Sequence, residues 1–472
     1  MPEELAPGTP DEVIERAESG PRVPAFDPTL GRAVAADGAG ERKHRLVAIG
    51  DSLTHGFQSG AIYNTDLSYG ATIARELGWT GFRFPRYGGP GGLPLNLEYI
   101  LRDLEQRFGS RIDPWEVPVA LFRAREVMDR IEDYWERGGG AAPPAVSGIN
   151  HALAVYGWDL RDALERTAEI CERVIRTPKD DAFDQIVENH AARAALRVYP
   201  RHDGAARRMT LLDAARALGA DGGIETLVVL LGANNALGTV TDLKVAWSED
   251  DFRRLGAKRA YTVWRPSHFA AELEALTAEV VRIDARHVIW ATVPHVTIAP
   301  IARGVGRKVA VGSRYFPHYT RPWIDDGRFD PRRHPHITGP QARAVDYAVD
   351  AYNDAIQATV ERARDAGRDW YLLEIAGLLD RLAHRRFIDD PTARPAWWTP
   401  YPLPPALQAL RPVPDSRFLT ADGEGGRASG GLFSLDGVHP TTVGYGLIAQ
   451  EITCAWPAST SAIRTAARGR TR

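Results

Sequence analysis

Short apolar runs alternate with helix-like segments along most of this chain. Residues 46–49, 226–231 and 288–293 form mostly apolar stretches that end at glycine or proline. Continuous runs of this length are typical of strands that are buried on both faces, as in a parallel sheet. Strands that alternate with helices in this way predict an α/β fold with a doubly wound parallel sheet. The other predicted strands are 152–155 and 370–375, and the predicted helices include 69–77, 159–175, 269–283 and 341–366.

Net charge and cysteine content narrow the range of functions. The 472 residues carry a formal net charge of −3, so no overall positive field favours nucleic acid as a partner. Only residues 464–472 at the end are locally basic, and we expect them to form a solvated tail. The two cysteines, Cys171 and Cys454, are too few for a disulfide framework or a cysteine-based zinc site.

The sequence shows no signal for export and no membrane span. Its first residues lack the basic start and apolar core of a signal peptide. No run of about eighteen apolar residues is present anywhere in the chain. We therefore expect a cytoplasmic protein.

A serine directly follows the first predicted strand. Residues 50–53 read Gly-Asp-Ser-Leu, and Gly50 and Asp51 break the apolar run, so Ser52 lies where strand gives way to helix. Open α/β sheets bind ligands at the carboxyl ends of their strands, and a helix N-terminus offers free N–H groups to negative charge. Ser52 is therefore a candidate nucleophile. The competing interpretation is a helix N-cap without a chemical role.

An aspartate and a histidine near the C-terminus supply what a nucleophilic serine needs. A serine hydroxyl becomes reactive near neutral pH only beside a base, and the base needs an acceptor that orients it. Asp436 and His439 are three residues apart and precede a predicted helix at about 442–455, so a tight turn can bring the carboxylate to one side of the imidazole. The competing interpretation is a surface turn with a helix-capping residue.

Two other turns follow predicted strands. Asn234 and Asn235 come at the carboxyl end of the strongest strand, where an asparagine-rich turn without function is the alternative. Gly157 follows the strand 152–155, whereas Gly89 lies in an earlier loop that is rich in glycine and proline.

Taken in order, these segments resemble the short sequence blocks of the GDSL, or SGNH, hydrolase superfamily. The matching blocks are Gly-Asp-Ser-Leu at 50–53, Ala-Val-Tyr-Gly at 154–157, Gly-Ala-Asn-Asn at 232–235 and Asp-Gly-Val-His at 436–439. The resemblance implies a flavodoxin-like, three-layer α/β/α fold. It also implies one hydrolase domain at 45–456, between a partly irregular leader at 1–44 and the basic tail at 457–472. The implied insertions lie at about 79–148, 177–222, 298–340 and 389–431.

The resemblance implies a catalytic triad and hence a reaction. Ser52 is the expected nucleophile, His439 the base and Asp436 the residue that orients the base. The expected reaction is hydrolysis of a carboxylic ester, of the esterase or lipase type, through an acyl-enzyme intermediate. Its substrate is a small-molecule or lipid ester, and no metal or organic cofactor is needed. An acyltransferase with the same triad, and an inactive binding protein on the same scaffold, are the alternatives.

The resemblance also implies an oxyanion hole. Its expected donors are the N–H groups of Ser52 and Gly157 and the side-chain amide of Asn234. Gly89 is the alternative to Gly157. Asn235 stands where the family usually has aspartate, which leaves Asn234 untouched but puts the supporting hydrogen bonds of the turn in question.

Other polar residues and two long segments are candidates for the substrate pocket. The residues expected to line it are Asp51, His55, Asn235 and His295. His334 and His336 lack a third ligand at a suitable spacing, so we expect no metal there. Two long segments, 298–340 and 389–431, are rich in aromatic residues and arginine, which favours ordered lids and not disorder. We expect these lids to cover a pocket for a sizeable, partly apolar group with an anionic part.

Overall fold

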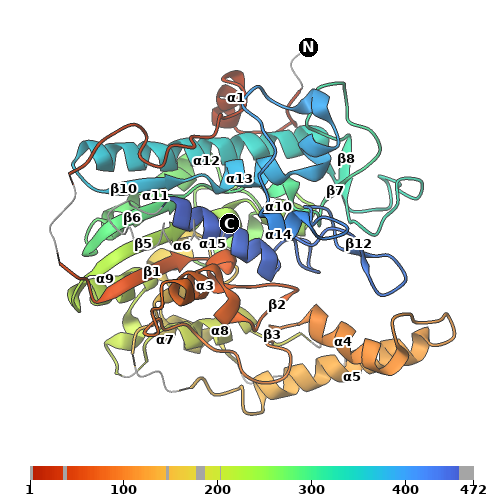
Figure 1. Cartoon of the computed structure of the whole chain (residues 1–472), viewed down its shortest axis with the longest axis horizontal. Helices are drawn as coiled ribbons and strands as arrows, with labels where there is room; N and C mark the ends of the chain where they lie inside the picture. Colours follow the sequence, from red (N-terminus) through yellow and green to blue (C-terminus); the bar gives the residue numbers. More distant parts are fainter. Residues whose placement is uncertain (1–3, 36–39, 145–147, 177–185, 202, 456–472) are drawn as a thin grey trace.

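The centre of the molecule is a parallel sheet of five strands. The computed structural model describes residues 4–35, 40–144, 148–176, 186–201 and 203–455, so the basic tail at 457–472 and part of the expected insertion at 177–222 lie outside the described residues. The strands lie in the order β10-β6-β5-β1-β4, and all pairs are parallel (Figure 1). This is the 2-1-3-4-5 order of flavodoxin-like sheets. The prediction of an α/β fold with a parallel sheet is confirmed. The five strands are β1 (His44–Gly50), β4 (Ala152–Ala154), β5 (Ile224–Leu230), β6 (Ala285–Ala291) and β10 (Trp370–Leu373).

Helices cover both faces of this sheet, because successive strand residues point to opposite sides. In β1, Val47 and Ile49 pack into one apolar core, and Leu46 and Ala48 pack into another. The first core is closed by α6 (Leu160–Glu165), α9 (Leu211–Ala220), α11 (Pro266–Val280) and α12 (Gly339–Asp365). The second is closed by α3 (Tyr69–Glu76), α13 (Ile375–Leu382) and α15 (Thr442–Ala455).

Further elements extend this core. The remaining helices are α1 (Asp11–Glu18), α2 (Ser52–His55), α4 (Leu97–Phe108), α5 (Val117–Glu136), α7 (Ala168–Val174), α8 (His190–Val198), α10 (Gly238–Thr241) and α14 (Pro405–Gln408). The remaining strands are β2 (Ala61–Ile62), β3 (Leu93–Pro94), β7 (Arg303–Gly304), β8 (His318–Thr320), β9 (Ile337–Thr338), β11 (Thr420–Ala421) and β12 (Arg427–Ser429). Single turns of other helix types lie at η1 (Thr65–Leu67), η2 (Ala206–Arg208), η3 (Ala233–Asn235), η4 (Ala257–Ala260), η5 (Val296–Ile298), η6 (His384–Ile388) and η7 (Pro391–Ala393).

The two long segments that were expected to be ordered lids contain regular structure. Segment 298–340 includes a three-stranded antiparallel sheet, β7-β8-β9. Segment 389–431 includes the short helix α14 and the hairpin β11-β12. Helices α4 and α5 pair with each other and project away from the central sheet (Figure 1).

The N-terminal segment packs on the domain. Helix α1 lies against α12 (Figure 1), and Val13 is fully buried between them. The Leu372 N–H of strand β10 donates to the Pro28 carbonyl at 3.0 Å. Residues that were expected to form a leader therefore contribute to the core.

Two expected elements differ from the structure. The helix predicted at 159–175 is broken into α6 and α7, because Arg166 is extended and Thr167 caps a new helix with its side chain. The strand predicted at 370–375 ends at Leu373, and α13 begins at Ile375. Among the described residues, no helix is long and apolar enough to cross a membrane.

Candidate active site

The register of three central strands brings the expected site together. Gly50 in β1 lies beside Ala154 in β4 and beside Leu230 in β5. The loops that carry Ser52, Gly157 and Asn234 therefore leave the same edge of the sheet, next to one another. In a sheet of this order, the crevice between the first strand and the third is the usual place for a ligand.

The turn that presents Ser52 depends on Gly50 and Asp51. A Cβ atom at Gly50 would lie 1.9 Å from Thr54 Oγ1 and 2.7 Å from the Leu230 oxygen, so only glycine fits. Asp51, and not Ser52, is the N-cap of α2, since its carboxylate accepts a hydrogen bond from Leu53 N–H at 3.0 Å. Ser52 is the first residue of the helix, and among the described residues no hydrogen bond uses its hydroxyl.

Asp436 holds the His439 imidazole in a defined orientation. Its Oδ2 atom lies 3.0 Å from Nδ1 of His439, and its Oδ1 accepts hydrogen bonds from the N–H groups of Val438 and His439, each at 2.8 Å. Gly60 N–H donates to Oδ2 at 3.0 Å. Burial alone would raise the pKa of the Asp436 carboxyl, but the imidazole and the backbone donors lower the pKa to about 2. An ionised Asp436 keeps the proton on Nδ1 and leaves Nε2 free to accept one.

Ser52 and His439 line the same two cavities. Within the described part of the chain, no hydrogen bond joins the Ser52 hydroxyl to Nε2 of His439. Such a bond often tightens only when substrate is present. The His439 imidazole packs on the Phe57 ring, with 4.6 Å between the ring centroids. Tyr445 holds the backbone at Phe57 in place, because its hydroxyl donates to the Phe57 carbonyl at 2.5 Å. Sequence reasoning missed Phe57 and Tyr445, since neither belongs to a recognised block.

Three hydrogen-bond donors meet at the polar side of Ser52. Ser52, Gly157, Asn234 and His439 line one cavity together. Across the described residues, no hydrogen bond uses the N–H of Ser52 or of Gly157. Asn234 donates one amide hydrogen to the Trp158 carbonyl at 2.8 Å and keeps the second. This arrangement can hold an oxygen that gains negative charge.

Gly157 and Gly89 occupy different parts of the molecule. Gly157 has a φ of +74°, in the left-handed region that favours glycine, and lines the cavity of Ser52. Gly89 packs against α5, where an added Cβ would lie 2.1 Å from the Tyr134 ring, and it lines neither cavity of Ser52.

Lys258 fixes the loop that carries Gly157. Its ammonium group donates to the Gly157 carbonyl at 3.1 Å and forms an ion pair with the buried carboxylate of Asp162. Asp159 and Asp162 form the capping box that starts α6. The lysine therefore joins the glycine loop to the first turn of this helix. The sequence contained no signal for this role, because Lys258 is about a hundred residues away.

Ser52 lies between an apolar and a polar cavity. The apolar cavity encloses about 870 Å³, including its open mouth. Its apolar lining includes Val296, Ile375, Leu378, Leu382, Leu447 and Ile448. The lining of the polar cavity includes Asp159, Thr241, Lys258, Arg259 and Tyr261. A substrate that reacts at Ser52 can thus place a hydrocarbon group on one side and a polar group on the other.

His55 supports the site but has no free nitrogen. Tyr156 N–H donates to its Nδ1 at 3.2 Å, so Nε2 carries the proton and donates to the Tyr87 hydroxyl at 2.7 Å. Tyr87 donates in turn to the Ala194 carbonyl. Burial lowers the pKa of His55 to about 3, which keeps the imidazole neutral. It fixes the backbone just before Gly157.

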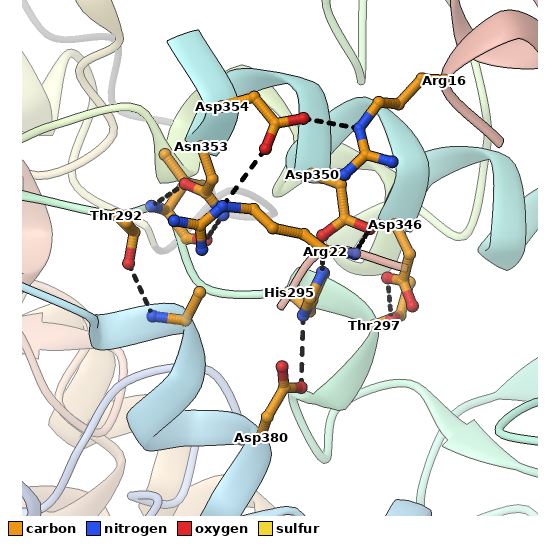
Figure 2. Close-up of polar contacts among 12 residues, drawn as sticks. Arg16, Arg22, Thr292, His295, Thr297, Asp346, Asp350, Asn353, Asp354 and Asp380 are labelled. Atoms are coloured by element: carbon orange, nitrogen blue, oxygen red, sulfur yellow. Dashed lines mark hydrogen bonds and ion pairs between the residues drawn. The ribbon is translucent and has the colours of Figure 1, made fainter. Parts of the chain in front are cut away.

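His295 is held as a cation behind the apolar cavity that it lines. Figure 2 shows its ring between two carboxylates, with Nε2 at 3.0 Å from Asp350 and Nδ1 at 3.2 Å from Asp380. Burial alone would lower the pKa of His295, but Asp380, Asp346 and Asp350 raise it to about 10. Both nitrogens act as donors, so His295 is not available as a base.

Asp51 and Asn235 are buried beneath the site. Burial raises the pKa of Asp51 to about 7, and its Oδ2 has no hydrogen-bond partner among the described residues. Among the same described residues, neither polar atom of the Asn235 amide has a hydrogen-bond partner. Neither residue lines the two cavities of Ser52. Both side chains are fully buried, and their expected place in the substrate pocket stays a prediction.

His334 and His336 lie in a loop and line neither cavity of Ser52. His334 accepts a hydrogen bond from Asp330 N–H, and His336 bonds to the His334 carbonyl. Within the described ranges, no group of three or more His, Cys, Asp or Glu side chains is arranged to hold a metal ion.

Comparison with known proteins returned no similarity: no family model, curated protein or solved structure matches the chain.

Proposed function

We propose that this chain is a GDSL/SGNH-type hydrolase that cleaves carboxylic esters. One observation carries the proposal. Four segments that are remote in sequence supply Ser52, Gly157, Asn234 and His439 to a single cavity, with Asp436 behind the imidazole. The flavodoxin-like strand order and the resemblance of the four sequence blocks support it further.

In the proposed reaction, Ser52 Oγ attacks the ester carbonyl carbon while Nε2 of His439 takes its proton. Asp436 stabilises the imidazolium that forms. The N–H groups of Ser52 and Gly157 and the free amide hydrogen of Asn234 bind the oxyanion. His439 then gives its proton to the alcohol oxygen as the C–O bond breaks, which leaves an acyl group on Ser52. Water, activated by the same imidazole, releases the acid.

Replacing the nucleophile tests this proposal. Ser52→Ala should lower kcat for p-nitrophenyl esters by at least about 10³-fold, because the attacking oxygen is lost. A fluorophosphonate probe should label Ser52 in the native protein, as measured by peptide mass mapping. The matched control is Ser68→Ala, which changes another buried serine, the N-cap of α3. Full activity in Ser52→Ala, or labelling at another residue, would contradict the proposal.

The apolar cavity predicts a preference for esters with a hydrocarbon chain. Leu447 lines this cavity and is 4% exposed. Leu447→Trp should fill the cavity and lower kcat/KM for an octanoyl ester by about tenfold, as expected for about 1–2 kcal/mol of lost apolar contact. The acetyl ester is the internal control and should change little. Equal losses for both esters would show that the hydrocarbon chain of the substrate does not bind in the apolar cavity.

A further inference from the structure

A third cavity lies where the two long segments meet. Five arginines line it, and we call it the arginine pocket: Arg303, Arg314, Arg385, Arg386 and Arg417. It encloses about 930 Å³ including its mouth, and among the described residues no Asp or Glu side chain lines it. Segment 298–340 supplies two of these arginines, the turn η6 supplies two and segment 389–431 supplies one.

Carboxylates outside the pocket balance only part of this charge. Arg303 pairs with Asp326, Arg386 with Asp346 and Arg417 with Asp415. Within the described chain, neither of the other two arginines has a carboxylate within ion-pair distance.

The two unpaired arginines differ in their surroundings. Burial lowers the pKa of Arg314, but Tyr315 and the more distant carboxylates of Asp346, Asp350 and Asp380 raise it overall. Burial and the neighbouring Arg303 lower the pKa of Arg385. Asp326, Asp389 and Tyr319 raise the pKa of Arg385 in part, so its positive charge is only partly compensated within the protein.

Two polar atoms of the lining are buried and unused. Nη1 of Arg386 and Nε of Arg303 have no hydrogen-bond partner in the described residues. The Arg386 side chain is only 5% exposed, and its Nη2 already bonds to Thr297 at 2.6 Å and to Asp346 at 2.9 Å. Figure 2 shows Thr297 and Asp346 at the edge of the buried charge network. Buried guanidinium donors without partners are costly, so the protein itself leaves these two arginines incompletely satisfied.

Aromatic rings hold the guanidinium groups in place. Arg385 lies over the Phe316 ring at 4.8 Å, and Arg314 and Arg386 lie over the Tyr315 ring at 5.5 and 5.6 Å. Arginine stacked on an aromatic ring is fixed before a ligand arrives, so less conformational freedom is lost on binding.

We propose that the arginine pocket binds a phosphoryl group. One carboxylate needs only one bidentate arginine, whereas a doubly charged phosphoryl group with three oxygens accepts hydrogen bonds from several. The pocket adjoins the proposed active site, because Ser416 lines both it and the apolar cavity. Phe418 in its wall also lies close to Gly437, where an added Cβ would be 2.8 Å from the Phe418 ring. The phosphoryl group belongs either to the ester substrate or to a separate ligand.

Titration calorimetry of pyrophosphate into the full-length Ser52→Ala protein tests the pocket without any turnover. This readout does not depend on the proposed esterase activity. We expect a Kd of about 1 mM or tighter at low salt. Arg385→Gln should weaken binding by about tenfold or more, since a hydrogen bond to a charged group contributes about 1.5–3 kcal/mol. Arg417→Gln provides a second variant should Arg385→Gln not fold.

The matched control is Arg328→Gln, which removes an exposed arginine of segment 298–340 that does not line the pocket. It should bind pyrophosphate within about twofold of the parent. No binding by the parent protein, unchanged binding in both pocket variants, or an equal loss in Arg328→Gln would overturn the proposal.

Inhibition kinetics with an uncharged ester separate the two sources of the phosphoryl group. Competitive inhibition by pyrophosphate supports a phosphoryl group that is part of the substrate. A change in kcat alone supports a separate ligand in the same pocket. If pyrophosphate does not bind and changes neither kcat nor KM, the proposal that the arginine pocket binds a phosphoryl group is wrong.

Discussion

Asp51 stabilises the turn that presents Ser52 at an electrostatic cost. Its carboxylate caps α2, but it is fully buried and its Oδ2 has no partner among the described residues. In the unfolded chain, this group titrates near pH 3.8, and in the folded protein its pKa is about 7. The folded state therefore binds more protons between these values, so raising the pH across this range destabilises the protein.

Asp51→Asn should remove this dependence, because an amide oxygen can still cap the helix. Relative to the native protein, the variant should gain little stability at pH 4 and up to about 4 kcal/mol at pH 9. Urea unfolding at the two pH values measures the difference. The exposed Asp66→Asn serves as the control. A gain that is the same at pH 4 and pH 9 would mean that the carboxyl is not buried as the structure places it.

Elements differ in how far they could be predicted from the sequence. The strands β1 and β5 were predictable, because strands buried on both faces have continuous apolar sequences. The candidate site residues Ser52, Asp436 and His439 lie in short local blocks that are visible in the sequence itself, although no family model matches the chain. The helix break at Arg166 was not predictable, because it is accompanied by a hydrogen bond from a residue that is distant in sequence. The Tyr199 hydroxyl donates to the Arg166 carbonyl. The arginine pocket is also non-local, because three separate segments form it.

The link between α6 and the glycine loop leads to a prediction for Lys258. Lys258→Met should leave the buried Asp162 carboxylate with Arg166 as its remaining ion-pair partner and release the Gly157 carbonyl. We expect the free energy of unfolding to fall by about 2–3 kcal/mol and kcat to fall about 10–100-fold. Steady-state kinetics well below the melting temperature separate the two effects.

Two variants serve as references for Lys258→Met. Lys258→Arg should restore part of kcat, because it keeps the cation, and the exposed Lys244→Met should change neither quantity. A loss of stability without any loss of kcat would show that Lys258 does not position the loop that carries Gly157.

At the scale of the whole molecule, the N-terminal segment is tied to the wall of the apolar cavity. Arg22 pairs with Glu374 at 2.6 Å, and its N–H donates to Oδ2 of Asp350 at 3.1 Å. Oδ1 of the same carboxylate accepts from His295, which lines the cavity (Figure 2). Composition gave no sign of this, because residues 1–44 are rich in proline, glycine and charge, and their docking depends on surfaces that only the folded domain provides.

Two neighbouring residues of α1 test whether this segment is part of the folded unit. Val13 is fully buried against α12, whereas Ile14 is 41% exposed. Val13→Asp should lower the free energy of unfolding by about 3 kcal/mol, because a buried carboxylate has no partner there. Ile14→Asp should lower it by about 0.5 kcal/mol or less.

If the segment detaches before the domain unfolds, the loss in Val13→Asp is limited to the docking free energy of the segment. Limited proteolysis will then cleave between residues 19 and 35. Equal unfolding midpoints and equal cleavage in the two variants would mean that the segment is a leader after all.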